Sequence, residues 1–289
     1  MQANSPGRWR SSRASYWTWG ARDWGRTGPA LERQTQALLE LLEEIGARAT
    51  FFVLGMTARS YPALVSAVAS RGHEIACHGD QHVPVHRQTP AQFAADVRAA
   101  RATIEELTGR APLGYRAPAF SITRSADWAL GVLAAEGFAY DSSVHDSPRI
   151  RGRLAPEHGE PHVLDAGDGA RLWELPPAVW RVGGARVPVG GASYWSVLPT
   201  ALVLRGLADA GAMPGLYLHP HELDPQPLRA ALPADAGRWQ RVRGWLREAQ
   251  RNAARRRAPQ VLRAIAGRHR LITYGEAYAQ LSGGSGARP

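Results

Sequence analysis

Hydrophobic residues recur at helical spacing in several segments, and short apolar runs separate these segments. Leu31, Leu38, Leu42 and Ile45 have the spacing of one helical face, and Gly46 predicts the end of that helix. The apolar run that follows predicts a strand over residues 49–54. The same alternation then repeats, with helices predicted at 62–70, 90–108 and around 128–133, and with strands predicted at 73–77, near 114 and at 138–141. Strands and helices in strict alternation predict an α/β fold with mostly parallel strands.

The second half of the chain has a different pattern. Residues 145–197 are rich in Gly and Pro with short β-like runs at 171–175 and 185–189, which predicts an insertion of loops and hairpins. Regular spacing returns with a helix near 198–210, an apolar strand at 215–218 and a basic helix over 235–266. A last strand and helix are predicted between 270 and 281, followed by a flexible tail over 282–289.

Length and composition suit a globular protein. The chain has 289 residues, of which 44% are hydrophobic, enough for one large or two small domains. It has no apolar run near the roughly 18 to 20 residues that span a bilayer, and no secretory signal pattern. We therefore expect a cytoplasmic protein without a transmembrane segment, with an atypical, poorly ordered N-terminus over residues 1–28. The oligomeric state stays open.

The charge balance raises a second class of function. Net charge is +10, and all 35 basic residues are Arg, many of them between 238 and 257. Such a stretch is either a solvated helix face or a contact for a polyanion or membrane surface. No zinc finger or aromatic RNA-binding motif accompanies it, so no nucleic acid partner is expected. The single cysteine, Cys77, lies in an apolar run and is expected to be a buried, inert thiol.

His78 and His82 follow a predicted strand. A spacing of four residues places both imidazoles on one face of a helical turn, where they can bind one metal ion. A zinc protease would have Glu directly after the first His, but this chain has Gly79. We therefore interpret the pair as two metal ligands of a site that still needs a third ligand and a general base.

Polar residues also follow three other predicted strands. Arg116 and Pro118 come after the strand near 114, Asp141 ends the next, and His219 follows the apolar strand at 215–218. In barrel-like α/β folds, catalytic groups come from several strand ends at one face. Each residue alone also has a structural interpretation, as an ion pair, a turn cap or a loop residue. Together they favour a functional site.

Several motifs in order carry a family resemblance. They are 49–55 (ATFFVLG), 72–79 (GHEIACHG) with His82, 114–123 (GYRAPAFSIT), 140–143 (YDSS) and 217–220 (YLHP) with 222–224 (ELD). On these motifs the chain resembles the polysaccharide deacetylases of the NodB-homology type, carbohydrate esterase family four, and most closely the subgroup associated with exopolysaccharide. The resemblance covers residues 29–281 as one domain, with a family-specific half from about residue 145.

The resemblance implies a fold and a chemistry. The implied fold is a distorted (β/α) barrel of about seven strands, and the implied reaction is the removal of N-acetyl groups from a polysaccharide or oligosaccharide. His78 and His82 would bind a divalent metal, with Zn²⁺ expected, that polarises the acetamide carbonyl and activates a water. His219 would be the general acid that protonates the departing amine.

Further roles are implied around this centre. Asp141 is the candidate for orienting His219, and Arg116 would hold the catalytic carboxylate. Pro118 and Phe120 would shape the wall of a sugar groove. Tyr194 and Trp195 are candidate sugar-stacking platforms, with core packing as the alternative for each.

The family pattern fails at one place. Its members begin with a strand that ends in paired acidic residues, one the general base and the other the third metal ligand. Here the corresponding segment, 15–20, reads SYWTWG, and the first acid in the chain is Asp23. Three explanations stay open: an N-terminus that is not the natural one, a degenerate homologue without catalysis, or a substitute acid such as Asp80 or Asp23. The chain as written is therefore expected to be weakly active or inactive.

Three function classes follow, in order of preference. The first is a metal-dependent deacetylase, and the second is a non-catalytic carbohydrate-binding homologue. The third is a nucleic-acid binder driven by the arginines, whose salt-sensitive binding would survive loss of the histidines.

Overall fold

The computed structural model describes residues 29–284 apart from 149–151, 153, 155–158, 168, 225 and 228–234. The expectations for residues 1–28, including the strand at 15–20 and the acid Asp23, lie outside the described residues, as do those for 285–289.

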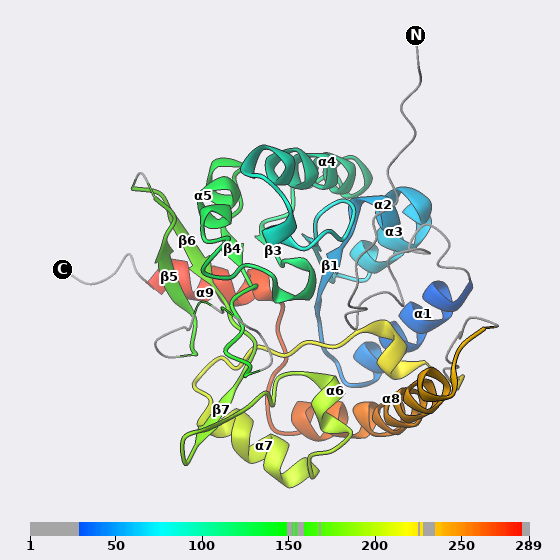
Figure 1. Ribbon diagram of the computed structural model, residues 1–289. Helices are drawn as coiled ribbons and strands as arrows, with labels where there is room; N and C mark the ends of the chain where they lie inside the picture. Colours follow the sequence, from blue (N-terminus) through cyan, green and yellow to red (C-terminus); the bar gives the residue numbers. More distant parts are fainter. Residues whose placement is uncertain are drawn as a thin grey trace.

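A six-stranded sheet lies at the centre of the molecule (Figure 1). Its order is β1 (Thr50–Val53), β2 (Glu74–Cys77), β3 (Gly114–Tyr115), β4 (Tyr140–Asp141), β6 (Arg171–Glu174) and β5 (His162–Asp165). The first five strands in this order are parallel, and β5 is antiparallel to β6. The predicted α/β class with a mostly parallel sheet is therefore confirmed.

Helices surround the sheet. In the first half these are α1 (Pro29–Glu44), α2 (Gly55–Ser60), α3 (Pro62–Ser70), α4 (Pro90–Thr108) and α5 (Trp128–Ala135), with short 3₁₀ helices η2 (Val85–Arg87) and η3 (Pro118–Phe120). The second half contains the hairpin β7 (Trp180–Val182) and β8 (Ala185–Val187), then α6 (Ala192–Trp195), α7 (Thr200–Asp209), η4 (Pro220–Leu223), α8 (Arg238–Ala266) and α9 (Tyr274–Gly284). None of the described helices is long and apolar enough to cross a membrane.

Local signals explain why α4 begins and ends where it does. The Thr89 side chain accepts the backbone N–H of Gln92, whose own side chain accepts the backbone N–H of Thr89. This reciprocal capping satisfies two N–H groups that the first turn leaves unpaired. Gly109 ends the helix with φ of 71°, a left-handed conformation that glycine adopts without a side-chain clash.

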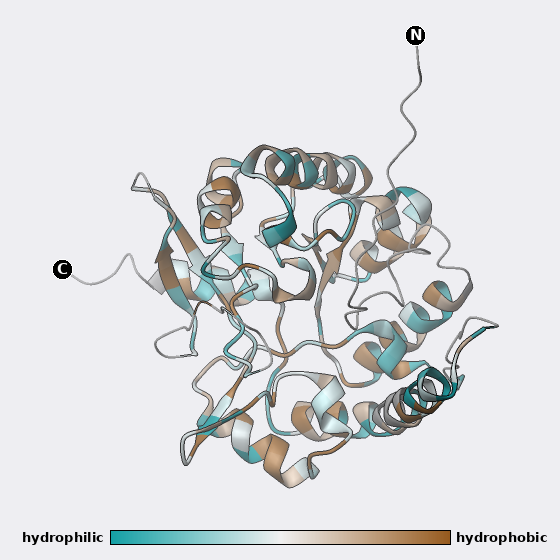
Figure 2. Ribbon diagram, in the orientation of Figure 1, coloured by the Kyte–Doolittle hydropathy of each residue, from teal (hydrophilic) through white to brown (hydrophobic). Residues whose placement is uncertain are grey.

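Two hydrophobic clusters fill the space around the sheet. The first joins the sheet to α2 through α5 and includes the fully buried Phe93 and Tyr115. The second joins α1, α6, α7 and the C-terminal half of α8, with Trp195 fully buried within it. Phe51 on β1 packs against both clusters. Figure 2 shows hydrophobic residues concentrated on the central strands, while the surrounding helices carry residues of both kinds.

Several predicted elements differ from those in the structure. The segment at 171–175 is not part of an insertion, because β6 pairs with β4 inside the main sheet. The predicted strand at 215–218 is only a pair of isolated parallel bridges, from Gly215 to Pro177 and from Tyr217 to Gly191. Residues 270–273 form no strand, and the last helix continues to Gly284 instead of ending at 281. The sheet of the described residues has six strands, where about seven were expected.

Candidate active site

His78 and His82 lie next to each other directly after β2. Their ring centroids are 5.3 Å apart, and the ring planes meet at 64°. Nδ1 of His78 lies 2.7 Å from the backbone oxygen of Arg116, and since a carbonyl only accepts, this nitrogen carries the proton. The lone pair of His78 is then on Nε2, the state in which an imidazole can bind a metal.

Burial keeps this pair neutral. It lowers the pKa of His78 to about 3 and also lowers the pKa of His82. Positive charge on His219 lowers both further, so the three imidazoles lie close enough to interact electrostatically. Neutral imidazoles at pH 7 are ready to act as ligands, because no proton has to leave before a metal binds.

The loop that carries the two histidines is held by a residue that the sequence analysis missed. The carboxylate of Asp96, on α4, accepts the backbone N–H groups of Asp80 and Gln81 at 2.8 and 3.2 Å. Gly79 has φ of 81°, and a Cβ there would lie 2.7 Å from Oδ2 of Asp96. His82 itself has φ of 55°, a conformation that non-glycine residues rarely adopt. Such local strain is found preferentially at functional sites.

Arg116 is buried at the end of β3, with 8% of its surface exposed. Its Nε donates to the backbone oxygen of Ser142 and a terminal nitrogen donates to the Ser142 hydroxyl, at 3.1 and 2.7 Å. The guanidinium also stacks 4.1 Å above the ring of Phe52. Among the described residues, no carboxylate forms an ion pair with it. A buried guanidinium without a carboxylate partner is unusual, because burying a charge is costly unless it is paired.

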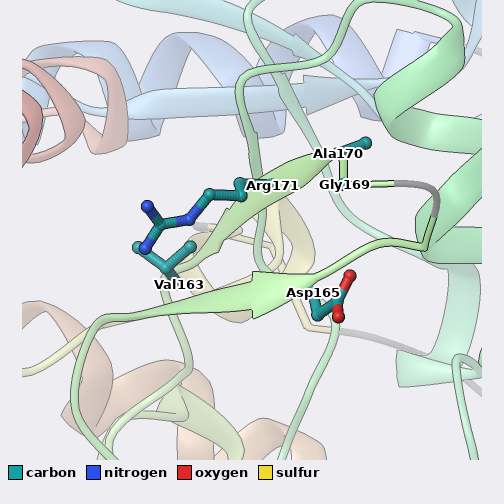
Figure 3. A pocket seen from close by; sticks show the side chains of 5 residues that line it. All are labelled: Val163, Asp165, Gly169, Ala170 and Arg171. Atoms are coloured by element: carbon teal, nitrogen blue, oxygen red, sulfur yellow. The ribbon is translucent and has the colours of Figure 1, made fainter.

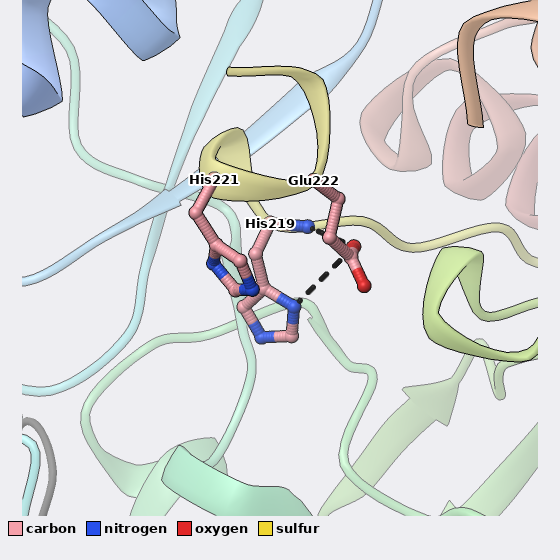
Figure 4. A group of neighbouring side chains, drawn as sticks. All are labelled: His219, His221 and Glu222. Carbon is pink, nitrogen blue, oxygen red and sulfur yellow. Dashed lines mark hydrogen bonds and ion pairs between the residues drawn. The ribbon is translucent and has the colours of Figure 1, made fainter. Parts of the chain in front are cut away.

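His219 faces Glu222 (Figure 4). Nδ1 of the exposed His219 ring lies 3.6 Å from Oε2 of the buried Glu222, and the same carboxylate oxygen accepts the backbone N–H of His219 at 2.8 Å. Burial alone would raise the pKa of Glu222, but its interactions with His219 and a hydrogen bond from Ser193 outweigh this and lower it. Glu222 is therefore ionised and fixed beside the imidazole.

Asp141 does not orient His219, so that prediction is wrong. Its two oxygens accept the backbone N–H and the hydroxyl of Ser143 at 3.2 and 2.5 Å. Asp141 also lies beside Glu174 in the register of β4 and β6, and both side chains are fully buried. Burial raises the pKa of Asp141 to about 6 and, together with the charge of Asp141, raises that of Glu174 well above its usual range. These two carboxyl groups favour a shared proton.

Aromatic rings surround the space between these groups. Phe120 contacts the rings of both His145 and Tyr217, with centroids 4.8 and 5.1 Å apart, and Tyr217 lies 6.3 Å from His219. His145 is 2% exposed, and its Nδ1 has no hydrogen-bond partner among the described residues. Its burial lowers its pKa to about 4. Phe120 is partly exposed with φ of 53°, so its predicted place beside the site is compatible with the structure.

One predicted sugar contact is wrong. Trp195 is fully buried and its indole N–H donates to the backbone oxygen of Val189 at 2.8 Å, so it is a core residue that no sugar can reach. Pro118 is buried as the first residue of η3, and its predicted place in the groove wall stays a prediction. Tyr194 is partly exposed and influences the pKa of Tyr217, so its stacking role stays a prediction.

No third candidate donor lies beside His78 and His82 among the described residues. None of their His, Cys, Asp or Glu side chains completes a three-donor group with His78 and His82. Asp80 pairs with Arg59 of α2 at 2.8 Å and is 7% exposed, so it does not serve as the substitute ligand. One group of three close donors does occur in the described part, made of His219, His221 and Glu222, whose ligand atoms lie within 4.8 Å of one another.

A surface hollow lies elsewhere on the sheet (Figure 3). It is lined by Val163, Asp165, Gly169, Ala170 and Arg171. Arg171 begins β6, whereas the site residues follow the ends of strands parallel to β6. The hollow therefore lies at the opposite end of the sheet from the histidines.

Two family models match the chain. Residues 25–136 match polysaccharide deacetylase, and residues 142–266 match a domain of unknown function, DUF3473. The first match contains His78, His82 and Arg116, and the second contains Glu174, His219 and Glu222. The candidate site is thus assembled from both matched regions.

Relatives of known name agree with the first match. The chain is 32% identical over 114 residues to a peptidoglycan deacetylase-like protein of Gibberella zeae, covering 38% of this chain and 33% of the relative. It is also 32% identical over 112 residues to a chitooligosaccharide deacetylase of Bradyrhizobium sp., covering 38% of this chain and 48% of the relative. The chain therefore spans between a third and a half of these relatives. A crystal structure from Mycobacterium smegmatis, assigned as a polysaccharide deacetylase, has the same fold, with a TM-score of 0.55 and 20% identity. The match covers 87% of this chain and 78% of the solved one.

Proposed function

Since the chain carries a polysaccharide deacetylase domain of the NodB type, we propose that it acts on N-acetylated sugars of a polysaccharide or oligosaccharide. The proposed reaction is a metal-dependent hydrolysis of the acetamide bond, in which acetate leaves and a free amine stays on the sugar. An exopolysaccharide is the proposed substrate. The observation that carries the proposal is the placement of His78 and His82 side by side directly after β2, with His219 near enough to influence the pKa of both.

His78 and His82 would hold the metal, with Zn²⁺ as the proposed ion. Both are neutral, and the hydrogen bond from Nδ1 of His78 to Arg116 directs its other nitrogen away from the backbone. This donor set fits a divalent transition metal, although it supplies two of the three protein ligands of a catalytic zinc site. When bound, the ion would polarise the acetamide carbonyl and lower the pKa of a water.

His219 would supply the proton that the departing nitrogen needs. When the carbon–nitrogen bond breaks, the amine is a poor leaving group unless it is protonated. The His219 ring is exposed, so a substrate can reach it, and Glu222 fixes its Nδ1 side. The proton on the opposite ring nitrogen is then the one available to the substrate. A buried carboxylate that holds an imidazole in one orientation also stabilises its protonated form.

The hydrolytic step would be slow. No described carboxylate pairs with Arg116, and the segment in which the family has its acidic pair has no acid in this chain. A general base contributes roughly 10² to 10⁴ in rate, so its absence would leave only weak turnover. For the same reason we keep a non-catalytic carbohydrate-binding protein as the alternative function.

One experiment separates the two functions. The full chain is incubated with Zn²⁺ and an N-acetylated chitooligosaccharide, and mass spectrometry of the sugar detects deacetylated product. Product from the wild type, but not from His219→Ala, would support the deacetylase. Binding of the sugar by isothermal titration calorimetry, with no product after long incubation and with equal affinity in His219→Ala, would favour the binding protein.

A further inference from the structure

The N-terminal half of α8 presents large apolar side chains to solvent. Trp239 is 77% exposed, Trp245 65%, Leu246 53% and Val242 40%. In contrast, the C-terminal half of the same helix is anchored in the core through Ala258, Val261, Leu262 and Ile265, none more than 3% exposed. The helix is thus fixed at one end by the core, and its other end carries two exposed indole rings. Figure 1 shows α8 at the rim of the molecule.

These apolar residues form one face of the helix. At about 100° per residue, Trp239, Val242, Trp245 and Leu246 fall within an arc of about 120°. Arg241 and Arg243 flank this arc, each about 40° outside it on opposite sides. Both are exposed, although Nε of Arg241 also donates to the backbone oxygen of Ala236 at 2.9 Å. Figure 2 shows the mixture of hydrophilic and hydrophobic residues along α8.

Nearly all the charged residues of this helix are positive. α8 contains nine arginines and a single acid, Glu248, within a chain of net charge +10. We propose that this face of α8 docks on an anionic lipid surface, with the tryptophans at the level of the headgroups and the flanking arginines on lipid phosphates. A basic helix with an aromatic and aliphatic stripe is the composition of helices that lie in the plane of a membrane interface.

Charge and chemistry favour a lipid surface over the other occupants. A second copy of the chain would bring two arginine-rich helices together, and like charges repel. Residues 1–28 contain five arginines and one acid, so they have the same sign of charge as the helix. Nucleic acid would match the arginines but not the exposed Val242 and Leu246, which gain nothing from phosphate. A lipid headgroup region satisfies both the charged and the apolar residues.

Vesicle co-sedimentation of the full chain tests the proposal. With vesicles of phosphatidylglycerol and phosphatidylcholine we expect binding that weakens as salt rises, and with phosphatidylcholine alone at least tenfold weaker binding. The double variant Trp239→Ser/Trp245→Ser should lose at least tenfold in partitioning. Arg238→Glu/Arg243→Glu should lose as much, since Arg238 is an exposed arginine on the first turn of α8, on the same side as the apolar face. The matched control Leu113→Ser/Leu202→Ser, which removes exposed apolar residues on other elements, should bind as the wild type does.

Three results would overturn the proposal. The first is equal binding to neutral and anionic vesicles, or binding that the tryptophan variant retains. The second is a dimer in light scattering that the tryptophan variant converts to monomer, which would assign the face to a second copy. The third is salt-sensitive retention of duplex DNA, without vesicle binding, that depends on the arginines and not on the tryptophans. The proposal does not depend on deacetylation, so these results are independent of the catalytic assay.

Discussion

Oε2 of Glu222 lies 3.6 Å from Nδ1 of His219 and also accepts the backbone N–H of His219 at 2.8 Å. The two residues are three positions apart on the short η4 turn, which Pro220 begins. One buried carboxylate therefore fixes both the backbone and the ring of the proposed proton donor. This arrangement assigns to Glu222 the positioning role that the family resemblance suggested for Asp141.

Glu222→Gln should lower the turnover of deacetylation about tenfold, because the imidazole loses its fixed, charge-stabilising partner. KM should stay unchanged, since Glu222 is buried and does not face the sugar. Acetate release over a range of substrate concentrations measures both parameters. Asp141→Asn is the informative comparison, because Asp141 bonds to Ser143 instead. A loss of turnover in Asp141→Asn and none in Glu222→Gln would contradict this assignment.

Zn²⁺ affinity should depend on the histidine pair after β2. We expect His78→Ala and His82→Ala each to weaken Zn²⁺ binding at least tenfold, measured by competition with a chromogenic chelator. His86→Ala is the control, since His86 is an exposed histidine on the neighbouring η2 turn. If His221→Ala alone abolished binding, the metal would belong to the group of His219, His221 and Glu222 instead.

The buried pair of Asp141 and Glu174 should make stability fall as pH rises. Burial raises both pKa values, that of Asp141 from its usual value near 4 to about 6 and that of Glu174 well above its usual range. The folded state therefore binds more protons than the unfolded state, and its stability is full below pH 4 and declines through pH 6 and above. Glu174→Gln removes one ionisable group of the pair, so thermal unfolding should show a smaller loss between pH 5 and 8.

The control for this prediction is Glu105→Gln, on the exposed side of α4. Its pH profile of melting temperature should match that of the wild type. A Glu174→Gln profile parallel to the wild-type profile would show that the carboxyl pair does not titrate in this range.

His145 should make the stability of the protein fall as pH drops, the opposite of the effect of the carboxyl pair. Its pKa is lowered to about 4 by burial, whereas an unfolded histidine titrates near 6.5. The contribution of His145 to the free energy of unfolding is therefore fully present above pH 6.5 and is lost as pH falls toward 4. The loss is about 2 kcal/mol at pH 5. His145→Phe, which keeps a ring between Phe120 and Tyr217, should abolish this part of the loss in urea denaturation at pH 7.5 and 5. An unchanged loss would mean that His145 stays accessible to protons.

Local signals in the sequence were sufficient to predict most of the helices and the ends of the strands. Phe93 and Val97 lie within α4, and the capping residues Thr89 and Gly109 lie directly beside its two ends. His78 and Arg116 were found for the same reason, since each directly follows a short apolar strand. These features depend on neighbours in sequence.

The features that the sequence did not predict depend on contacts between segments far apart in the chain. Glu174 meets Asp141 only because β6 joins the main sheet, and nothing in a Gly-rich and Pro-rich region predicts that pairing. The sequence left open whether Trp195 is a sugar platform or a core residue, because its short helix gives no period from which burial could be read. The partnership of His219 and Glu222 could have been found from their spacing of three residues, but a strand-end rule pointed to Asp141 instead.

The central claim is that the described residues bring together the imidazoles of the proposed deacetylase site with no carboxylate base beside them. Acetate release from an N-acetylated chitooligosaccharide, with Zn²⁺ and beside the chitooligosaccharide deacetylase of Bradyrhizobium sp. as reference, tests it most directly. We predict a rate about 10² to 10⁴ below the reference, with the residual activity lost in His78→Ala. A rate equal to that of the reference, also abolished by His78→Ala, would contradict the claim, because the chain would then have to supply a carboxylate base.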